Sequence, residues 1–277
     1  MKNMVIATTD SYKFLPLERA LQGLSRVGFR QIELLAASEW TPHFDPSSAS
    51  ESDRRRLQEA LDRHGLRIAS LSGHSNLATE AGMNKFMDRL EFAASQGVPI
   101  VNTGVGDLST EELRRDFHRN IRRIAEVASK KKITVALEPH GDWAPSGKAL
   151  VKLIREIGSD SIRINYDTAN VVFYSGERPE VDIVHAASFV AHVHMKDKIG
   201  GKKEWNFPGL GKGEIDFPSI LNTLEQSGYS GPFSIEIELT HETERNAELI
   251  DQAFRDSLLY LRSLNRLESL PGLPGGT

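Results

Sequence analysis

The stretch ITVALEPHGDWAPSGKALVKLIREIGSDSIRINYD, residues 133–167, contains one full repeat of the pattern that decides the fold. It begins with the strand-like run ITVALE and ends with the strand-like run IRINYD. The helical segment between the two runs ends at Gly158, because glycine favours the residue that follows a helix. A strand, a helix and a strand in this order predict two parallel strands joined by a crossover helix.

The same alternation runs outward from this stretch in both directions. Between the strand-like runs lie helical segments such as residues 110–130, where apolar side chains recur at helical spacing on one face. A last helix is expected from about residue 242 to residue 265. The strand-like runs cover residues 4–8, 30–35, 67–72, 99–104, 133–138, 162–167, 191–196 and 232–238.

The polar residues of the last four runs favour a closed barrel over an open sheet. They fall on one alternating face of each strand, whereas sheets covered by helices on both faces are continuously apolar. An open sheet would not gather side chains from four strands around one point, but a barrel with a polar lumen does. We therefore predict one (β/α)₈ barrel over residues 1–265 and a flexible tail, rich in proline and glycine, over residues 266–277.

Composition narrows the function classes. The chain has 277 residues, 39% of them hydrophobic, with 34 Lys and Arg against 38 Asp and Glu, which argues against a nucleic-acid partner. It has no cysteine, so any metal would be held by oxygen and imidazole groups. We find no signal-peptide or membrane-spanning pattern, and we expect a cytoplasmic protein without a membrane partner.

Four residues carry the chemistry that we expect. Glu138, Asp167, His194 and Glu236 fall at or close to the carboxyl ends of four successive predicted strands, all on the inward face. Active sites of such barrels lie at these strand ends. Three carboxylates placed together would repel one another at neutral pH, so the cluster predicts a bound divalent cation.

Several motifs resemble the xylose isomerase-like TIM barrel superfamily, in particular its sugar phosphate isomerase/epimerase family. They are ALEPH (136–140), NYDTAN (165–170), HVHMKD (192–197) and the segment 211–238. The resemblance implies that Glu138, Asp167, His194 and Glu236 bind one divalent ion, with Mn²⁺ expected first and Mg²⁺, Co²⁺ or Zn²⁺ as alternatives. It also favours Glu236 over Glu238 as the ligand from the last strand.

Two departures from related enzymes limit what the resemblance implies. The ketose 3-epimerases have a substrate-contacting histidine where this chain has Asn170. Endonuclease IV, a nuclease of the same superfamily, has extra histidines for three zinc ions, which this chain lacks. A mononuclear site and a small sugar or sugar-acid substrate are therefore expected, rather than a nuclease site.

The ligand set predicts an isomerase or epimerase of a keto sugar. The ion would polarise the substrate carbonyl. The resemblance to the epimerases implies that Glu138 and Glu236 are the catalytic residues and face each other across the substrate, one removing a proton and the other returning it. A lyase, dehydratase or decarboxylase of a 3-keto sugar uses the same ligands, so the sequence leaves these alternatives open. A sugar-binding barrel without activity is a further alternative, and a homo-oligomer is compatible with all of them.

Five residues around the cluster are candidates for substrate binding: His74, His140, Asn170, Lys196 and Trp205. Lys196 would meet an acidic group of the substrate, or alternatively it would pair with Asp197. Trp205 lies in the long loop 198–213 and would stack on a sugar ring, or alternatively the loop is a surface excursion or an oligomer contact. Trp143 allows the same two interpretations, and His192 is interpreted as a buried structural residue.

Overall fold

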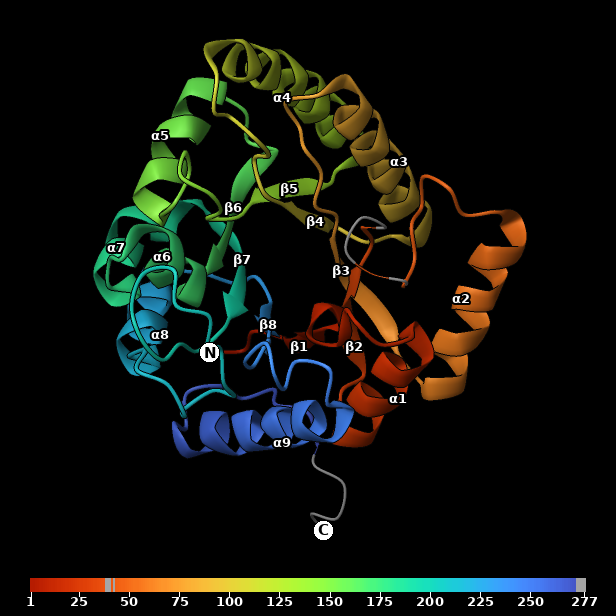
Figure 1. The fold of residues 1–277 in the computed structure, drawn as a ribbon, viewed down its shortest axis with the longest axis vertical. Coiled ribbons are helices and arrows are strands. Elements are labelled where there is room, and N and C mark those ends of the chain that lie inside the picture. Colours follow the sequence, from red (N-terminus) through yellow and green to blue (C-terminus); the bar gives the residue numbers. More distant parts are fainter. Residues whose placement is uncertain (38–40, 42, 273–277) are drawn as a thin grey trace.

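The computed structural model describes residues 1–37, 41 and 43–272, and it confirms the closed barrel (Figure 1). Parallel strands pair in sequence order, and β1 closes the ring by pairing with β8. The strands are β1 (Val5–Thr8), β2 (Gln31–Leu35), β3 (Arg67–Ser72), β4 (Ile100–Thr103), β5 (Thr134–Leu137), β6 (Ile162–Asp167), β7 (Val190–Met195) and β8 (Phe233–Ile235).

Helices form an outer layer around the ring of strands (Figure 1). A turn at Gly176, which has a φ of 80°, divides the connection between β6 and β7 into α6 and α7. The helices are α1 (Leu17–Val27), α2 (Glu51–His64), α3 (Glu80–Gln96), α4 (Glu111–Lys131), α5 (Gly147–Ile157), α6 (Thr168–Ser175), α7 (Pro179–Ala186), α8 (Phe217–Gln226) and α9 (Ala247–Ser263), with the 3₁₀ helices η1 (Thr9–Tyr12) and η2 (Ala187–Phe189). Within the described ranges, no helix has both the length and the apolar character needed to span a membrane.

Helix ends follow the sequence signals with one exception. Gly158 ends α5 with a φ of 70°, and the Asp216 side chain caps α8 by accepting from the Ser219 backbone N–H at 3.1 Å. The last helix, however, begins at Ala247 rather than near residue 242. Asn246 is its N-cap and accepts from the Leu249 N–H at 3.1 Å, because a short amide side chain favours this position over a helical one.

The segment after α9 returns to the start of the chain. The Met1 ammonium donates to the Arg266 carbonyl at 2.7 Å, and the Glu268 N–H donates to the Met1 carbonyl at 3.0 Å. Leu267 between them is buried. The first residues of the predicted tail, 266–268, therefore contact the N-terminus, and residues 273–277 lie outside the described residues.

The lumen of the barrel contains a layer of hydrogen-bonded polar side chains, as the strand pattern predicts. His192 lies between the Ser70 hydroxyl, 3.1 Å from its Nε2, and the Asn165 carbonyl oxygen, 2.9 Å from its Nδ1. The Asn102 amide lies 3.3 Å from the same His192 Nδ1 and donates to Glu33 at 3.0 Å. All five side chains are fully buried. This hydrogen-bonded layer therefore forms a rigid floor below the side chains at the carboxyl ends of the strands.

Candidate metal centre

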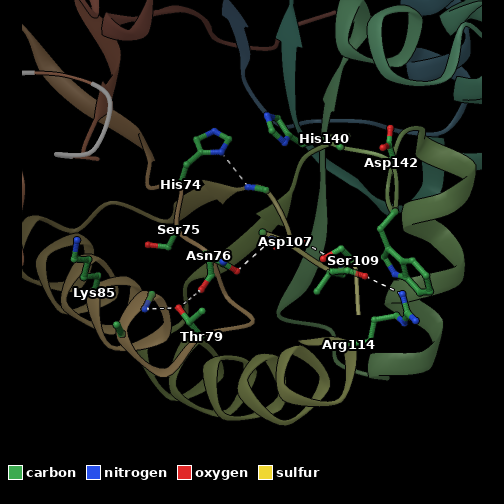
Figure 2. A pocket seen from close by; sticks show the side chains of 17 residues that line it. His74, Ser75, Asn76, Thr79, Lys85, Asp107, Ser109, Arg114, His140 and Asp142 are labelled. Carbon is green, nitrogen blue, oxygen red and sulfur yellow. Dashed lines mark hydrogen bonds between the residues drawn. The ribbon is translucent and has the colours of Figure 1, made fainter. Parts of the chain in front are cut away.

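A cavity of about 780 Å³ opens among the loops that follow β3, β4 and β5 (Figure 2). His74 and His140, two of the predicted substrate-binding residues, line its inner part. The Gly104 backbone N–H donates to His74 Nδ1 at 3.1 Å, which leaves His74 Nε2 to face Glu138 Oε2 at 3.4 Å. His74 therefore joins the cavity to the predicted ligand cluster.

The four predicted metal ligands come together at the carboxyl ends of β5 to β8. Asp167 is the last residue of β6 and lies opposite His194 of β7, while Glu138 and Glu236 each follow the end of their strand by one residue. All four side chains are buried.

His194 Nδ1 lies near an oxygen of each of the three carboxylates. The ligand atoms of Glu138, Asp167 and His194 all lie within 4.8 Å of one another, whereas Glu236 forms a group of this kind with Asp10 and Glu238. His194 Nδ1 lies 3.0 Å from Glu236 Oε2, 3.5 Å from Glu138 Oε2 and 3.7 Å from Asp167 Oδ2. Three of these atoms, His194 Nδ1, Asp167 Oδ2 and Glu236 Oε2, are buried and have no hydrogen-bond partner among the described residues. Buried polar atoms are normally satisfied, so three unsatisfied donor and acceptor atoms that point at one another fit a divalent ion.

Asp167 is oriented by the helix that it begins. One carboxylate oxygen, Oδ1, accepts from the backbone N–H groups of Ala169 at 2.9 Å and Asn170 at 2.8 Å, and so caps α6. The other oxygen, Oδ2, is thereby directed into the cluster. Asp167, in the turn formed by residues 166–168, is thus both the N-cap of α6 and a candidate metal ligand.

Glu138 is held by amide groups on both of its oxygens. Asn170 Nδ2 donates to Oε1 at 2.7 Å, and Asn165 Nδ2 donates to Oε2 at 3.0 Å. Burial raises the pKa of Glu138, but the positive charges of His194, His74 and Lys196 outweigh it and hold that pKa well below the usual range. Asn170 is therefore placed to orient a candidate ligand.

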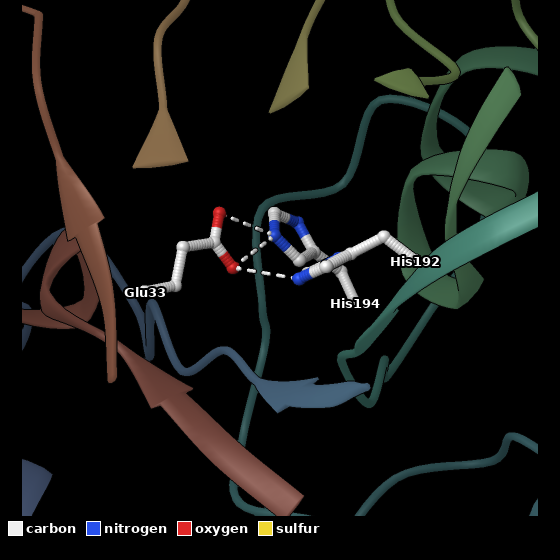
Figure 3. A group of neighbouring side chains, drawn as sticks. All are labelled: Glu33, His192 and His194. Atoms are coloured by element: carbon white, nitrogen blue, oxygen red, sulfur yellow. Dashed lines mark hydrogen bonds and ion pairs between the residues drawn. The ribbon is translucent and has the colours of Figure 1, made fainter. Parts of the chain in front are cut away.

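His194 is oriented from the far side of the barrel by Glu33 of β2 (Figure 3). Its Nε2 lies 3.0 Å and 2.9 Å from the two oxygens of the Glu33 carboxylate. Burial raises the pKa of Glu33, but the charge of His194 and its hydrogen bond to Glu33 outweigh burial and lower that pKa to about 2. An ionised Glu33 accepts a hydrogen bond from the Nε2–H group of His194, so Nδ1 of His194 points toward the cluster.

His192 does not reach the cluster, which agrees with its interpretation as a structural residue. Burial lowers the pKa of His192 to about 4, so its ring is neutral within the hydrogen-bonded floor. The two histidines of the HVH motif share one face of β7 but differ in depth by two residues. Depth along the strand therefore separates the structural histidine from the candidate ligand.

Lys196 lies among carboxylates and not beside Asp197. Its Nζ forms an ion pair with Glu238 and lies 3.6 Å from Glu236 Oε2 and 3.7 Å from Asp167 Oδ2. Asp197 instead accepts from the backbone N–H groups of Gly211 at 2.8 Å and of Gly213 at 2.9 Å. The alternative pairing of Lys196 with Asp197 is therefore wrong, because Asp197 faces away into the loop that it holds.

Trp205 lies within that loop, in a cluster of rings. Its indole stacks on His241 with ring centroids 4.8 Å apart and an interplanar angle of 14°, and it meets Phe173 and Phe207 edge to face. The loop is anchored by paired backbone hydrogen bonds between Phe207 and Leu239, at 3.0 Å and 2.9 Å. The segment is therefore packed onto the end of β8.

Sequence reasoning missed two residues near the cluster, Asp10 and Lys13. Lys13 forms an ion pair with Glu238, and burial together with Glu236 and Glu238 raises the pKa of Asp10 to about 7 against the effect of Lys13. A signal was present, because Asp10 lies two residues after the first strand and so is also near a carboxyl end. Glu238 is occupied by Lys13 and Lys196, which leaves Glu236 as the ligand candidate from the last strand.

These features define a (β/α)₈ barrel with three carboxylates and one imidazole gathered at its strand ends. A family model described as "Xylose isomerase-like TIM barrel" matches residues 21–264, and the chain belongs to this family.

The relatives of known activity are sugar epimerases. The L-ribulose-5-phosphate 3-epimerase UlaE of Escherichia coli (strain SMS-3-5) is 26% identical over 238 residues, which cover 80% of this chain and 81% of that protein. A D-allulose 3-epimerase from Methylomonas sp. has a TM-score of 0.72 at 18% identity, over 95% of this chain and 99% of that one. A xylose isomerase-like TIM barrel protein from Mycobacterium smegmatis, solved in complex with magnesium, has a TM-score of 0.72 at 19% identity, over 93% and 99%.

Proposed function

We propose that this chain is a divalent-metal-dependent sugar epimerase that inverts one carbon next to the carbonyl of a keto sugar. The observation that carries the proposal is the convergence of unsatisfied, buried atoms of Asp167, His194 and Glu236 beside Glu138. The curated relatives support the reaction type, because they are 3-epimerases of similar length.

Glu138, Asp167, His194 and Glu236 would hold one ion, with Mn²⁺ as the first expectation. When bound, such an ion polarises the substrate carbonyl and makes the neighbouring C–H more acidic. Asp167 and His194 are each fixed by a second contact, to the N-terminus of α6 and to Glu33, so their part is to hold the ion in place.

Glu138 and Glu236 are the proton carriers in this proposal. They come from β5 and β8, two strands that are not neighbours, and each lies close to His194 Nδ1. One carboxylate removes the proton from the carbon next to the carbonyl to give an enediolate, and the other returns a proton to the opposite face. The result is inversion at that carbon with no net change of atoms.

His74 would position both Glu138 and the substrate. Its Nε2 is 3.4 Å from Glu138 and its ring lines the cavity, so a substrate hydroxyl placed there meets an N–H donor. His140 lies against Tyr174 with ring centroids 4.6 Å apart, and burial, followed by the charge of His74, lowers the pKa of His140 to about 4. A neutral His140 both donates and accepts, as a sugar hydroxyl requires.

The test combines metal content with isotope exchange. The purified protein should hold about one divalent ion per chain, and with Mn²⁺ it should exchange one carbon-bound hydrogen of a ketose or ketose phosphate in D₂O. Nuclear magnetic resonance identifies the carbon and the epimer formed. Loss of water or carbon dioxide from the substrate would assign a lyase instead, and no exchange with any ketose would contradict the proposal.

A further inference from the structure

The cavity beside the cluster extends beyond the part that a single ketose would occupy. We propose that its outer part is a second sugar subsite with Trp143 as the stacking surface, so that the preferred substrate is a ketose carrying a further neutral sugar unit. The inference rests on the proposed function only for the position of the ketose at the ligand cluster.

The cavity lies beside the cluster, and its lining includes His74 and Trp143 but none of the four candidate ligands. Its inner part is lined by His74, which contacts Glu138, and by His140, two residues beyond Glu138. Trp143 lines it as well and follows Glu138 by five residues, so the two lie within roughly 17 Å of each other. A molecule with one end at Glu138 can therefore reach Trp143.

The volume exceeds what one ketose needs. If each non-hydrogen atom takes at most the roughly 30 Å³ of a water molecule in the liquid, the carbons and oxygens of a ketohexose fill about 360 Å³. The cavity has about 780 Å³, so more than half of it remains for another unit. Gly104 lies between His74 and His140, and a side chain there would contact both residues, at 3.6 Å from His74 and 3.5 Å from His140.

Trp143 is presented as a fixed, accessible ring. It is 48% exposed, and the Arg114 guanidinium lies 4.4 Å from its ring centroid. Arg114 is itself held by the Leu108 carbonyl at 2.9 Å and by Glu111 at 3.0 Å. An aromatic ring that is already ordered binds the C–H face of a sugar with little further loss of conformational entropy.

The remaining lining favours a neutral, hydroxylated ligand over a phosphate. The formally charged side chains are Lys85 and Arg114 against Asp107 and Asp142, so the charges balance. Arg114 already forms an ion pair with Glu111, and this pairing weakens its attraction for a phosphate. Hydroxyls and amides supply the other polar groups, from Ser75, Asn76, Thr79 and Ser109 (Figure 2).

Calorimetry on the Mn²⁺-loaded protein tests the subsite directly. The probes are D-fructose, D-fructose 6-phosphate and two glucosyl ketoses. Leucrose carries its glucosyl unit on O5 of fructose, and isomaltulose carries it on O6. We expect at least one glucosyl ketose to bind about tenfold more tightly than D-fructose, the gain that one good ring contact supplies. Trp143→Ala should remove most of this gain without changing the affinity for D-fructose by more than about twofold.

Two further variants make the result specific. Trp143→Phe should retain most of the gain, and Leu259→Ala, at an exposed apolar residue of α9, should leave all affinities unchanged. The inference is overturned if both glucosyl ketoses bind no better than D-fructose, if the phosphate binds most tightly, or if Trp143→Ala weakens D-fructose equally. A change of oligomeric state in Trp143→Ala, seen by light scattering, also overturns it, because Trp143 would then be a contact between copies.

Failure of this inference is distinct from failure of the proposed function. Exchange of D-fructose in D₂O without a gain from the glucosyl unit rejects the subsite alone. A gain in affinity without exchange of any ketose keeps the subsite and rejects the epimerase.

Discussion

The two sides of the ligand cluster differ in how they are filled. On the side of β1, β7 and β8, Lys13, Lys196 and Glu238 form a buried group of ion pairs, and Phe207 covers Lys196 with its ring centroid 4.5 Å from the ammonium. On the side of β3 to β5, the loops leave a cavity of about 780 Å³ in front of His74 and His140. Glu236 borders the packed side, and Glu138 borders the open side.

This difference separates two tasks that one site must perform. Closely placed carboxylates need compensating charge, and the packed side supplies it with the buried Lys196 and the half-buried Lys13. A substrate needs space and replaceable polar contacts, and the open side supplies these with histidine, amide and hydroxyl groups. The predictions that follow compare the two sides, from the largest expected effect to the smallest.

Removing one proton carrier from each side should have the largest effect. Glu138→Gln and Glu236→Gln should each lower turnover by about 10²- to 10⁴-fold, because an amide cannot exchange the proton. Deuterium exchange and metal content, measured on the same samples, separate loss of the proton carrier from loss of the ion. Asp167→Asn should lose mainly metal, and normal exchange in both glutamine variants would contradict the two-carboxylate mechanism.

The packed side should be sensitive to loss of its central charge. Lys196→Met leaves Glu236, Glu238 and Asp167 without their shared cation, and it should lower the free energy of unfolding by about 3–5 kcal/mol. Urea unfolding monitored by circular dichroism measures this loss, and the added change Glu238→Gln should restore part of it.

Substrate preference adds a second measurement on the same variant. Because the Lys196 ammonium already contacts carboxylates, Lys196→Met should lower kcat/KM equally for neutral and acidic sugars. A selective loss for acidic sugars would instead support a direct contact with a substrate carboxylate or phosphate.

Metal should stabilise the folded chain measurably. At a free Mn²⁺ concentration one hundred times its Kd, the free energy of unfolding should rise by about 2.7 kcal/mol, because the ion binds only the assembled cluster. Unfolding with and without a chelator measures the rise. Asp167→Asn should reduce it strongly, whereas Trp143→Ala on the open side should leave it unchanged.

Glu33 lies below the cluster, and its replacement tests how far metal binding depends on the orientation of His194. Glu33→Gln should weaken Mn²⁺ binding by about 10- to 100-fold, because the amide no longer fixes His194 with Nδ1 toward the ligands. Calorimetric titration with Mn²⁺ measures the change, and the exposed Glu177→Gln serves as a matched control. Equal affinities in the two variants would show that His194 keeps its orientation without Glu33.

The smallest effect is expected at Trp205. Its indole is already stacked on His241, so a substrate should change its fluorescence only slightly, and only when Mn²⁺ is present. The difference between the parent protein and Trp205→Phe isolates this signal. A response that persists in chelator would mean that Trp205 reports an event away from the cluster.

The barrel and the ligand candidates could be predicted because they depend on local patterns. Glu138, Asp167, His194 and Glu236 each lie within one residue of the end of a strand, and parallel strands bring such ends to one face. The end of α5 likewise follows from a single residue, Gly158. The structure brings together the four residues of the predicted ligand set. That they bind an ion stays a prediction.

The contacts that support these residues could not be predicted in the same way. Glu33 meets His194 across the lumen, a pairing over 161 positions that exists only once the ring is closed. The pairing of Lys196 with Glu238 rather than Asp197 could not be predicted, because the direction of a long side chain depends on its neighbours in space, and its contact with a substrate stays a prediction. The later start of α9 shows the same limit, since Asn246 competes successfully with the helical pattern before it.

Closure of the barrel by β1 and β8 also has a consequence for the order of events during synthesis. The first four strands supply Glu33 but none of the four candidate ligands, and Glu236 follows the very last strand. A chain emerging from the ribosome therefore has no complete cluster until β8 has left the exit tunnel and docked beside β1. Acquisition of the ion would mark the final step of maturation, so truncated chains would remain without metal.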